Sequence, residues 1–313
     1  MTTTTILEPG QIEAAAGDIP KLLLPPADIF ASRARRLRQL ASTHALGDYL
    51  RFIARLVEIQ HDLLRGMAAV PLADAQLLAQ CREYHMPPFS TAGWSRHVAW
   101  RGVLADLLKA MQTDAPQTAR EVMAALANKD ATWLENQAEH MLARQFGAVD
   151  LACAPFIGAA LQVYWTYMAS ALKSEQVSWP ELPNLCPVCG SHPVASVVRI
   201  GSNVSGIRYL QCSLCSSEWH VVRAKCSNCD NSKGIVYYSL EHEAGNKEAE
   251  VVRAESCPEC KTYLKVMQMD KDPHAEAGAD DLASLTLDLL MGDEGLSRSG
   301  YNLLMIHGAD EGT

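Results

Sequence analysis

Four Cys-x-x-Cys pairs in the second half of the chain restrict its fold more than any other feature of the sequence. Each pair, here called a knuckle, places two thiolates on one side of a turn, and two knuckles supply the four sulfurs of a tetrahedral metal site. Gaps of 22, 10 and 27 residues separate consecutive knuckles. A single Cys-x-x-Cys is also typical of a redox pair, but four at these spacings indicate metal. The knuckles are Cys186 and Cys189, Cys212 and Cys215, Cys226 and Cys229, and Cys257 and Cys260.

The start of the chain bears on how these cysteines are used. Met1–Asp18 consists of small and polar residues and contains no apolar run. A secretory signal peptide requires such a run, so we expect a cytoplasmic protein in a reducing compartment. There, paired cysteines act as metal ligands rather than as disulfides. Arg35 and Arg36 form a twin-arginine pair, but no apolar segment follows them, and we interpret them as part of a solvated helix face.

The sequence around the knuckles predicts short β-strands. Runs of β-branched and aromatic residues alternate there with turn residues, among them Gly206 and the pair Gly245-Asn246. Each long gap between knuckles contains a predicted hairpin, and the short gap contains one strand. The predicted strands are Ser196–Ile200, Ile207–Gln211, Glu218–Val222, Ile235–Leu240 and Val251–Arg253.

The predicted hairpins also predict which knuckles share a metal. A hairpin brings its two ends together, so the first two knuckles form site 1 and the last two form site 2. Two small zinc-ribbon-like β modules then follow each other, at residues 184–224 and 225–270. The first gap is longer than the common spacing of about 15–20 residues, and an interleaved pairing, first knuckle with third and second with fourth, is the alternative. Closed four-thiolate sites leave no position for substrate and are often purely structural, and spacing does not separate iron from zinc.

The first half of the chain predicts an all-α domain. After a proline-containing leader over residues 1–26, expected to be extended or disordered, apolar residues recur at three- and four-residue steps through residues 27–178. We expect about six helices there, one opened by a capping box at Thr132 and Glu135. Leu151–Leu172 has no charged residue. It contains Pro155 and lacks a Lys/Arg cluster on either flank, so we interpret it as a buried helix and expect no stable membrane insertion.

Charge is distributed unevenly and argues against a nucleic-acid partner. The formal net charge is −9, of which residues 271–313 contribute most, with 2 Lys/Arg against 9 Asp/Glu. Residues 176–270, which hold the knuckles, are close to neutral, with 9 against 10. A zinc-ribbon protein that binds a phosphate backbone needs a basic surface. The acidic segment 271–313 predicts a helix, Asp280–Met291, capped by Asp280 and followed by a tail.

No catalytic motif accompanies the metal sites, so we expect no enzyme. The sequence contains no phosphate-binding loop, nucleophile elbow or His-Glu-x-x-His. Cys81 and Cys153, outside the knuckles, are interpreted as buried apolar residues. Arg208, Tyr209, Trp219 and His220 flank the knuckles. They either pack within the hairpins or form an exposed recognition patch, since arginine and aromatic residues are favoured at interfaces.

At these residues the sequence resembles the family of FdhE, the formate dehydrogenase accessory proteins. The matching residues run from Cys186-Pro187-Val188-Cys189-Gly190-Ser191 through Arg208-Tyr209-Leu210-Gln211-Cys212-Ser213-Leu214-Cys215 and Trp219. They continue through Cys226-Ser227-Asn228-Cys229, Cys257-Pro258-Glu259-Cys260 and Tyr263-Leu264-Lys265 to the acidic helix starting Asp280-Asp281-Leu282. The resemblance covers residues 184–306 specifically and the helical half by size and character.

This resemblance implies a cytoplasmic assembly factor that binds the catalytic subunit of a respiratory formate dehydrogenase before export. It also implies rubredoxin-like modules and favours iron over zinc in both sites. Arg208, Tyr209, Trp219, Asp280 and Asp281 are then candidate partner-binding residues. Two other functions stay open: a rubredoxin-like electron-transfer protein and, despite its charge, a zinc-ribbon nucleic-acid-binding protein.

Overall fold

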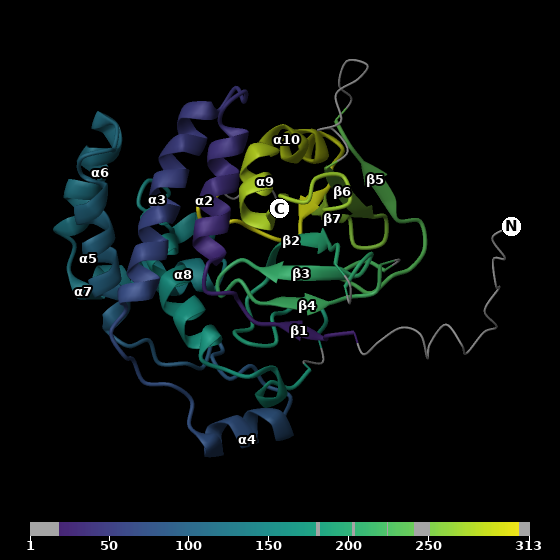
Figure 1. Ribbon diagram of the computed structural model, residues 1–313, viewed down its shortest axis with the longest axis horizontal. Helices are drawn as coiled ribbons and strands as arrows, with labels where there is room; N and C mark the ends of the chain where they lie inside the picture. Colours follow the sequence, from purple (N-terminus) through teal and green to yellow (C-terminus); the bar gives the residue numbers. More distant parts are fainter. Residues whose placement is uncertain (1–18, 180–181, 202–203, 224, 241–250, 307–313) are drawn as a thin grey trace, which may run out of the picture.

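The protein consists of a helical layer and a mixed β-sheet, and two further helices near the C-terminus pack on one face of the sheet (Figure 1). The structure is a computed structural model and describes residues 19–179, 182–201, 204–223, 225–240 and 251–306. The predicted leader therefore lies largely outside the described residues, as does the predicted turn at Gly245-Asn246. Within residues 19–26, Leu22–Leu23 forms the short strand β1, which pairs with β4 (Glu218–His220).

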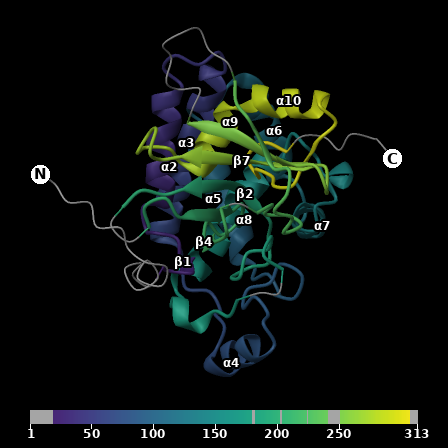
Figure 2. The ribbon, with the colours of Figure 1, turned by 90° about the vertical axis from the view of Figure 1, so that its right-hand side faces the viewer.

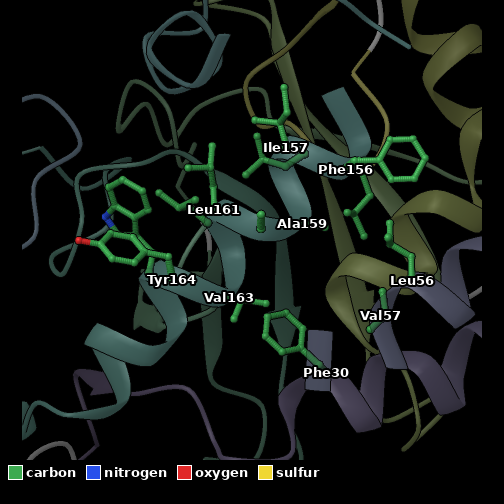
Figure 3. Packing of buried hydrophobic residues seen from close by; sticks show 14 of the residues in the cluster. Phe30, Leu56, Val57, Phe156, Ile157, Ala159, Leu161, Val163 and Tyr164 are labelled. Atoms are coloured by element: carbon green, nitrogen blue, oxygen red, sulfur yellow. The ribbon is translucent and has the colours of Figure 1, made fainter. Parts of the chain in front are cut away.

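Seven α-helices make up the predicted helical region, and α8 lies at its centre. Fourteen of the seventeen residues of α8 are buried, which explains its uncharged sequence. In Figure 3, Phe156 and Val163 of this helix lie toward side chains of α2 and α3. No described helix is both long and apolar enough to cross a membrane. The helices are α2 Ile29–Leu40, α3 Gly47–Gly66, α4 Ala75–Glu83, α5 Ala99–Met111, α6 Gln117–Ala127, α7 Ala131–Leu142 and α8 Ala154–Ser170, with short 3-10 turns at Phe146–Ala148 and Ser174–Gln176.

The predicted capping box of this region is wrong by two residues. Helix α7 starts after Asp130, whose carboxylate accepts a hydrogen bond from the Trp133 backbone N–H at 2.8 Å. Aspartate is among the strongest N-cap residues, and it takes the role that the sequence pattern assigned to Thr132.

The seven described strands of the second half and β1 form one continuous sheet with the order β1-β4-β3-β2-β7-β6-β5, and β8 pairs with β7. Both predicted hairpins are present, as β2–β3 and β5–β6. They are joined by a parallel pairing of β2 with β7, centred on Val197 and Met267. Figure 2 shows β7, β2, β4 and β1 following one another through the sheet. The strands are β2 Pro193–Val198, β3 Arg208–Cys212, β4 Glu218–His220, β5 Val236–Tyr238, β6 Val252–Cys257, β7 Thr262–Gln268 and β8 Ser297–Arg298.

The acidic C-terminal segment forms two helices instead of the single predicted one. Helix α9 spans Ala277–Ala283 and α10 spans Leu285–Asp293, with Ser284 between them. The N-cap is Glu276, whose carboxylate accepts from the Ala279 N–H at 2.7 Å, so the predicted cap Asp280 lies inside α9. Both helices pack on one face of the sheet, where α9 contacts β2 and Leu287 of α10 packs with Tyr263 of β7.

Candidate metal centres

Site 1 consists of the four cysteines that the hairpin argument assigned to it. The Sγ atoms of Cys186, Cys189, Cys212 and Cys215 all lie within 4.8 Å of one another. Cys186 Sγ is 3.6 Å from Cys215 Sγ, and Cys189 Sγ is 3.4 Å from Cys212 Sγ. The hairpin β2–β3 positions the second knuckle against the first, as predicted.

Site 2 repeats this arrangement with the third and fourth knuckles. Cys226 Sγ is 3.7 Å from Cys260 Sγ, and Cys229 Sγ is 3.6 Å from Cys257 Sγ. The four sulfurs again lie within 4.8 Å of one another. The hairpin β5–β6 brings these knuckles together, so the adjacent pairing is confirmed and the interleaved alternative is wrong.

The sulfur positions fit a four-thiolate metal ion and exclude disulfides. A disulfide needs an S–S distance of about 2.05 Å, and all eight cysteines are free thiols at larger separations. A tetrahedron with metal–sulfur bonds of about 2.3 Å has edges of about 3.8 Å. The separations of 3.4–3.7 Å lie close to that edge. All-sulfur tetrahedra suit zinc or iron.

All four knuckles have the same backbone turn, which sequence analysis did not predict. The residue after the second cysteine has a positive φ in each: Gly190 at 74°, Ser216 at 58°, Asp230 at 61° and Lys261 at 54°. The Gly190 N–H donates to the carbonyl of Cys186 at 2.8 Å, and Asp230 and Lys261 donate equivalently to the first cysteine of their own knuckles. The turn directs both thiols of a knuckle toward one point.

A polar residue two positions after the second cysteine completes each turn. The Cys212 N–H donates to the carbonyl of Ser217 at 2.8 Å, and the Cys226 N–H donates to that of Asn231 at 2.8 Å. The side chains at three of the four positions lie against sulfur as well. Ser217 Oγ is 3.3 Å from Cys215 Sγ, and Thr262 Oγ1 is 3.0 Å from Cys260 Sγ. The recurrence of Ser191, Ser217, Asn231 and Thr262 at one offset is the sequence signal for these residues.

Burial makes a compensating cation necessary at site 1. Removal from water raises the pKa of the Cys186 and Cys212 thiols well above the ordinary value. Burial acts in the same direction on Cys215, but hydrogen bonds from the other three cysteines and Ser217 outweigh it and lower the pKa of that thiol. Four thiolates in such a site require positive charge, which a divalent metal ion supplies.

At site 2 the thiols of the fourth knuckle are the more acidic ones. Burial raises the pKa of Cys257, but the backbone N–H of Cys260 and the side chain of Asn231 outweigh it and bring that pKa to about 6. The pKa of Cys260 is also lowered, since hydrogen bonds led by that to Thr262 outweigh burial. Burial raises the pKa values of Cys226 and Cys229. The lowered pKa values at site 2 therefore both belong to the fourth knuckle.

The two sites differ in their access to solvent. All four cysteines of site 1 belong to the main hydrophobic core and are at most 1% exposed. The Phe89 N–H donates to the Val188 carbonyl at 3.0 Å, which ties the first knuckle to the helical layer. At site 2, Cys229 is exposed and Cys260 is partly exposed. Site 1 is therefore internal, and site 2 lies at the surface.

The predicted exposed patch around the knuckles is wrong, because its main residues are buried. Arg208 is 1% exposed, and Tyr209 and Trp219 are fully buried. Arg208 forms a bidentate ion pair with Glu255 at 2.8 and 2.9 Å, and the Trp219 indole N–H donates to the Pro183 carbonyl at 2.8 Å. His220 is partly exposed beside Lys21. The alternative interpretation, packing within the hairpins, is the one found.

Asp280 and Asp281 are likewise internal and cannot present their carboxylates to a partner in this conformation. Asp280 is 3% exposed and pairs with Arg36 of α2 at 2.6 Å. Asp281 is 2% exposed and pairs with Lys265 of β7 at 3.2 Å and with Arg298 of β8. Burial raises the pKa of Asp281, but the charges of Arg298 and Lys265 outweigh it and lower that pKa. These ion pairs attach α9 to α2 and to the sheet.

Comparison with known proteins identifies the family over nearly the full chain. Three family models match, described as FdhE, N-terminal (residues 19–180), FdhE, central domain (residues 185–223), and FdhE, C-terminal domain (residues 224–305). The chain belongs to the FdhE family. The "Protein FdhE homolog" of Pseudomonas aeruginosa is 43% identical over 306 residues, which cover 98% of this chain and 99% of that protein. The homolog from Serratia proteamaculans is 42% identical over 296 residues, 94% of each chain.

A solved structure of an FdhE protein has the same fold. The crystal structure of the FdhE protein from Pseudomonas aeruginosa superposes with a TM-score of 0.85 at 41% sequence identity. The match covers 93% of this chain and 100% of that chain. The resemblance inferred from the knuckles is therefore confirmed, and it extends through the helical layer.

Proposed function

We propose that this protein is a cytoplasmic assembly or maturation factor for respiratory formate dehydrogenase that binds the catalytic subunit before export. The observation that carries the proposal is its FdhE family membership over nearly the full chain, together with two four-cysteine sites. Such membership implies an accessory role toward formate dehydrogenase rather than catalysis.

Site 1 holds the two halves of the molecule in a fixed relation. Gln162 of α8 donates to the Ser213 carbonyl inside the second knuckle at 2.8 Å. The Thr91 N–H donates to the Cys189 carbonyl at 2.9 Å. The four thiolates of site 1 lie in the main core and would repel one another without a cation, so metal binding there is coupled to folding. The result is a rigid platform for a client protein.

Site 2 is the centre that a client or a reductant can approach. Around it lie Trp179 and Val222, both more than a third exposed, which line a cavity of 290 Å³ with Cys226. A bound metal would supply the charge that its thiolates need, and iron, which we favour over zinc, would also carry one electron. Cys229 and Cys260 would hold such an ion within reach of solvent.

Co-purification with the catalytic subunit tests the proposed function. Tagged protein, prepared anaerobically, is expected to retain the formate dehydrogenase catalytic subunit of its own organism. Cys229→Ser addresses site 2, and Cys81→Ser serves as the control because Cys81 is buried outside both sites. Failure of the unaltered protein to retain the subunit contradicts the proposal. Full retention by a folded Cys229→Ser protein would show that site 2 takes no part in docking.

Electron transfer is a second candidate, favoured specifically by the exposure of Cys229. Transfer between proteins requires a centre near the surface, and site 2 meets this requirement while site 1 does not. The protein as isolated should then be coloured and should bleach when reduced. A colourless protein that holds stoichiometric zinc removes this candidate and leaves the assembly role intact.

A further inference from the structure

Strand β5 is the last strand of the sheet and has a neighbour on one side only within the described chain. It pairs antiparallel with β6, from Val236 opposite Ser256 to Tyr238 opposite Ala254. Its other side faces away from the sheet, at the edge seen in Figure 1. Free strand edges are templates for pairing with another chain.

The register shows which backbone groups are available at this edge. The Gln268 N–H of β7 donates to the Val251 carbonyl at 2.8 Å, so the backbone groups of Val251, just before β6, point toward β7. Since backbone direction alternates along an antiparallel strand, Ala254 and Ser256 of β6 point their backbone groups toward β5. Their respective partners in β5, Tyr238 and Val236, point their N–H and C=O groups toward β6. The N–H and C=O of Tyr237, which lies between them, therefore point away from the sheet.

Natural sheets protect an edge by keeping its strand short, by covering it, or by placing lysine, proline or a bulge on it. Strand β5 is short, at three residues, but these residues include neither lysine nor proline. Here the edge presents apolar surface: Val236 is 47% exposed and Tyr237 is 44% exposed. The tyrosine is nevertheless fixed, because its hydroxyl donates to Glu255 Oε2 at 2.7 Å. An ordered, exposed apolar edge is suited to a strand-adding partner.

Positively charged side chains beside Tyr237 favour a partner that carries acidic residues. A cavity of 140 Å³ adjoins it on the face of the sheet away from α10. The single carboxylate lining it, Glu255, is already paired with buried Arg208. Arg223 and Arg253 form no ion pair with any described residue, so the described lining of the cavity carries a net positive charge. The lining residues are Val198, Arg208, Arg223, Tyr237, Arg253, Glu255, Val266 and Gln268.

We propose that β5 is the docking strand for the client, which adds an extended segment of alternating apolar and acidic residues to the sheet. The backbone of Tyr237 pairs with the added strand, and an acidic side chain of that strand enters the cavity beside Arg223 and Arg253. This inference rests on the proposed function and specifies which surface carries it.

Two substitutions at one position separate backbone pairing from side-chain contact. Tyr237→Pro removes the outward N–H without removing a hydrogen bond to β6, and proline is tolerated on edge strands. Tyr237→Val is the matched control, since it also loses the ring and the hydroxyl but keeps the N–H. Arg223→Gln and Arg253→Gln, combined, test the charge independently of strand geometry.

The measurement is the affinity of each variant for the immobilised catalytic subunit of formate dehydrogenase from the same organism, with thermal unfolding as the check of folding. We expect Tyr237→Pro to bind at least tenfold more weakly than Tyr237→Val. The double arginine variant should bind more weakly and lose salt dependence.

The outcomes separate this inference from the proposed function. If the unaltered protein binds the subunit and Tyr237→Pro binds as well as Tyr237→Val, strand addition at β5 is refuted and the assembly role stands. If Tyr237→Pro fails to fold, unchanged affinity of the double arginine variant refutes the inference instead. If the unaltered protein does not bind the subunit, the proposed function and the inference both fail.

Discussion

The side-chain amide of Gln162, in the middle of α8, donates a hydrogen bond to the carbonyl of Ser213 in site 1 at 2.8 Å. Gln162 also accepts a hydrogen bond from Gln60 of α3 at 3.0 Å. A polar chain therefore runs from α3 through the apolar core to a metal-binding knuckle, and it couples the helical layer to site 1.

Replacing Gln162 with leucine should destabilise the protein although leucine is more apolar. The Ser213 carbonyl would lose its buried donor, at a cost of about 1–3 kcal/mol. Chemical denaturation of the metal-loaded protein measures this. The surface variant Gln117→Leu is the control and should change stability by less than about 0.5 kcal/mol. Equal stability of the two variants would argue against the coupling.

Metal should leave the two sites at different rates. Site 1 is enclosed by the core, whereas Cys229 of site 2 is exposed. With excess chelator we expect two phases, site 2 faster by on the order of tenfold or more, because site 1 opens only with the surrounding core. Absorbance of a chromogenic chelator follows the release. Cys229→Ser should remove the fast phase alone, and a single phase in the unaltered protein would contradict the assignment.

Gly190 should resist substitution because of its left-handed backbone. Its φ is 74°, and a Cβ there would meet only ordinary contacts, 3.6 Å from Pro87. Gly190→Ala therefore isolates the backbone cost, about 1–2 kcal/mol. Gly102→Ala, within α5 with open space around it, should stabilise by up to about 1 kcal/mol. Thermal unfolding compares them, and equal shifts would count against the knuckle geometry.

Removing one member of the buried ion pair between Arg208 and Glu255 should strongly lower the free energy of unfolding. Both side chains are at most 4% exposed. Arg208→Met leaves Glu255 buried and unpaired, at about 3–5 kcal/mol. Arg38→Met, which breaks an exposed pair with Glu58, should cost less than about 1 kcal/mol. Denaturant titrations measure both, and an added Glu255→Leu change should recover part of the loss.

The knuckles determined which parts of the fold were predictable from sequence. Their spacing predicted both hairpins and both quartets, because a hairpin allows only its own ends to meet. The sequence did not reveal β7, since Lys265 and Gln268 make Thr262–Gln268 look too polar for a central strand. Lys265 is buried there through its ion pairs with Asp281 and Asp288.

The remaining wrong predictions concern charged residues whose ion-pair partners lie far away in the sequence. Asp280 was expected to cap a helix at the surface, but Arg36, 244 residues away, pairs with it inside the protein. Arg208 was a candidate for an exposed patch, but Glu255 pairs with it across the sheet. Local patterns show that such residues are charged, and they do not show which distant partner neutralises them.

The number of metal ions bound per chain tests the central claim most directly. Elemental analysis of protein prepared anaerobically should find two ions per chain, and a Cys229→Ser, Cys260→Ser double variant should retain one, in site 1. Fewer than two tightly bound ions in the unaltered protein, or disulfides among the eight knuckle cysteines, would contradict the account.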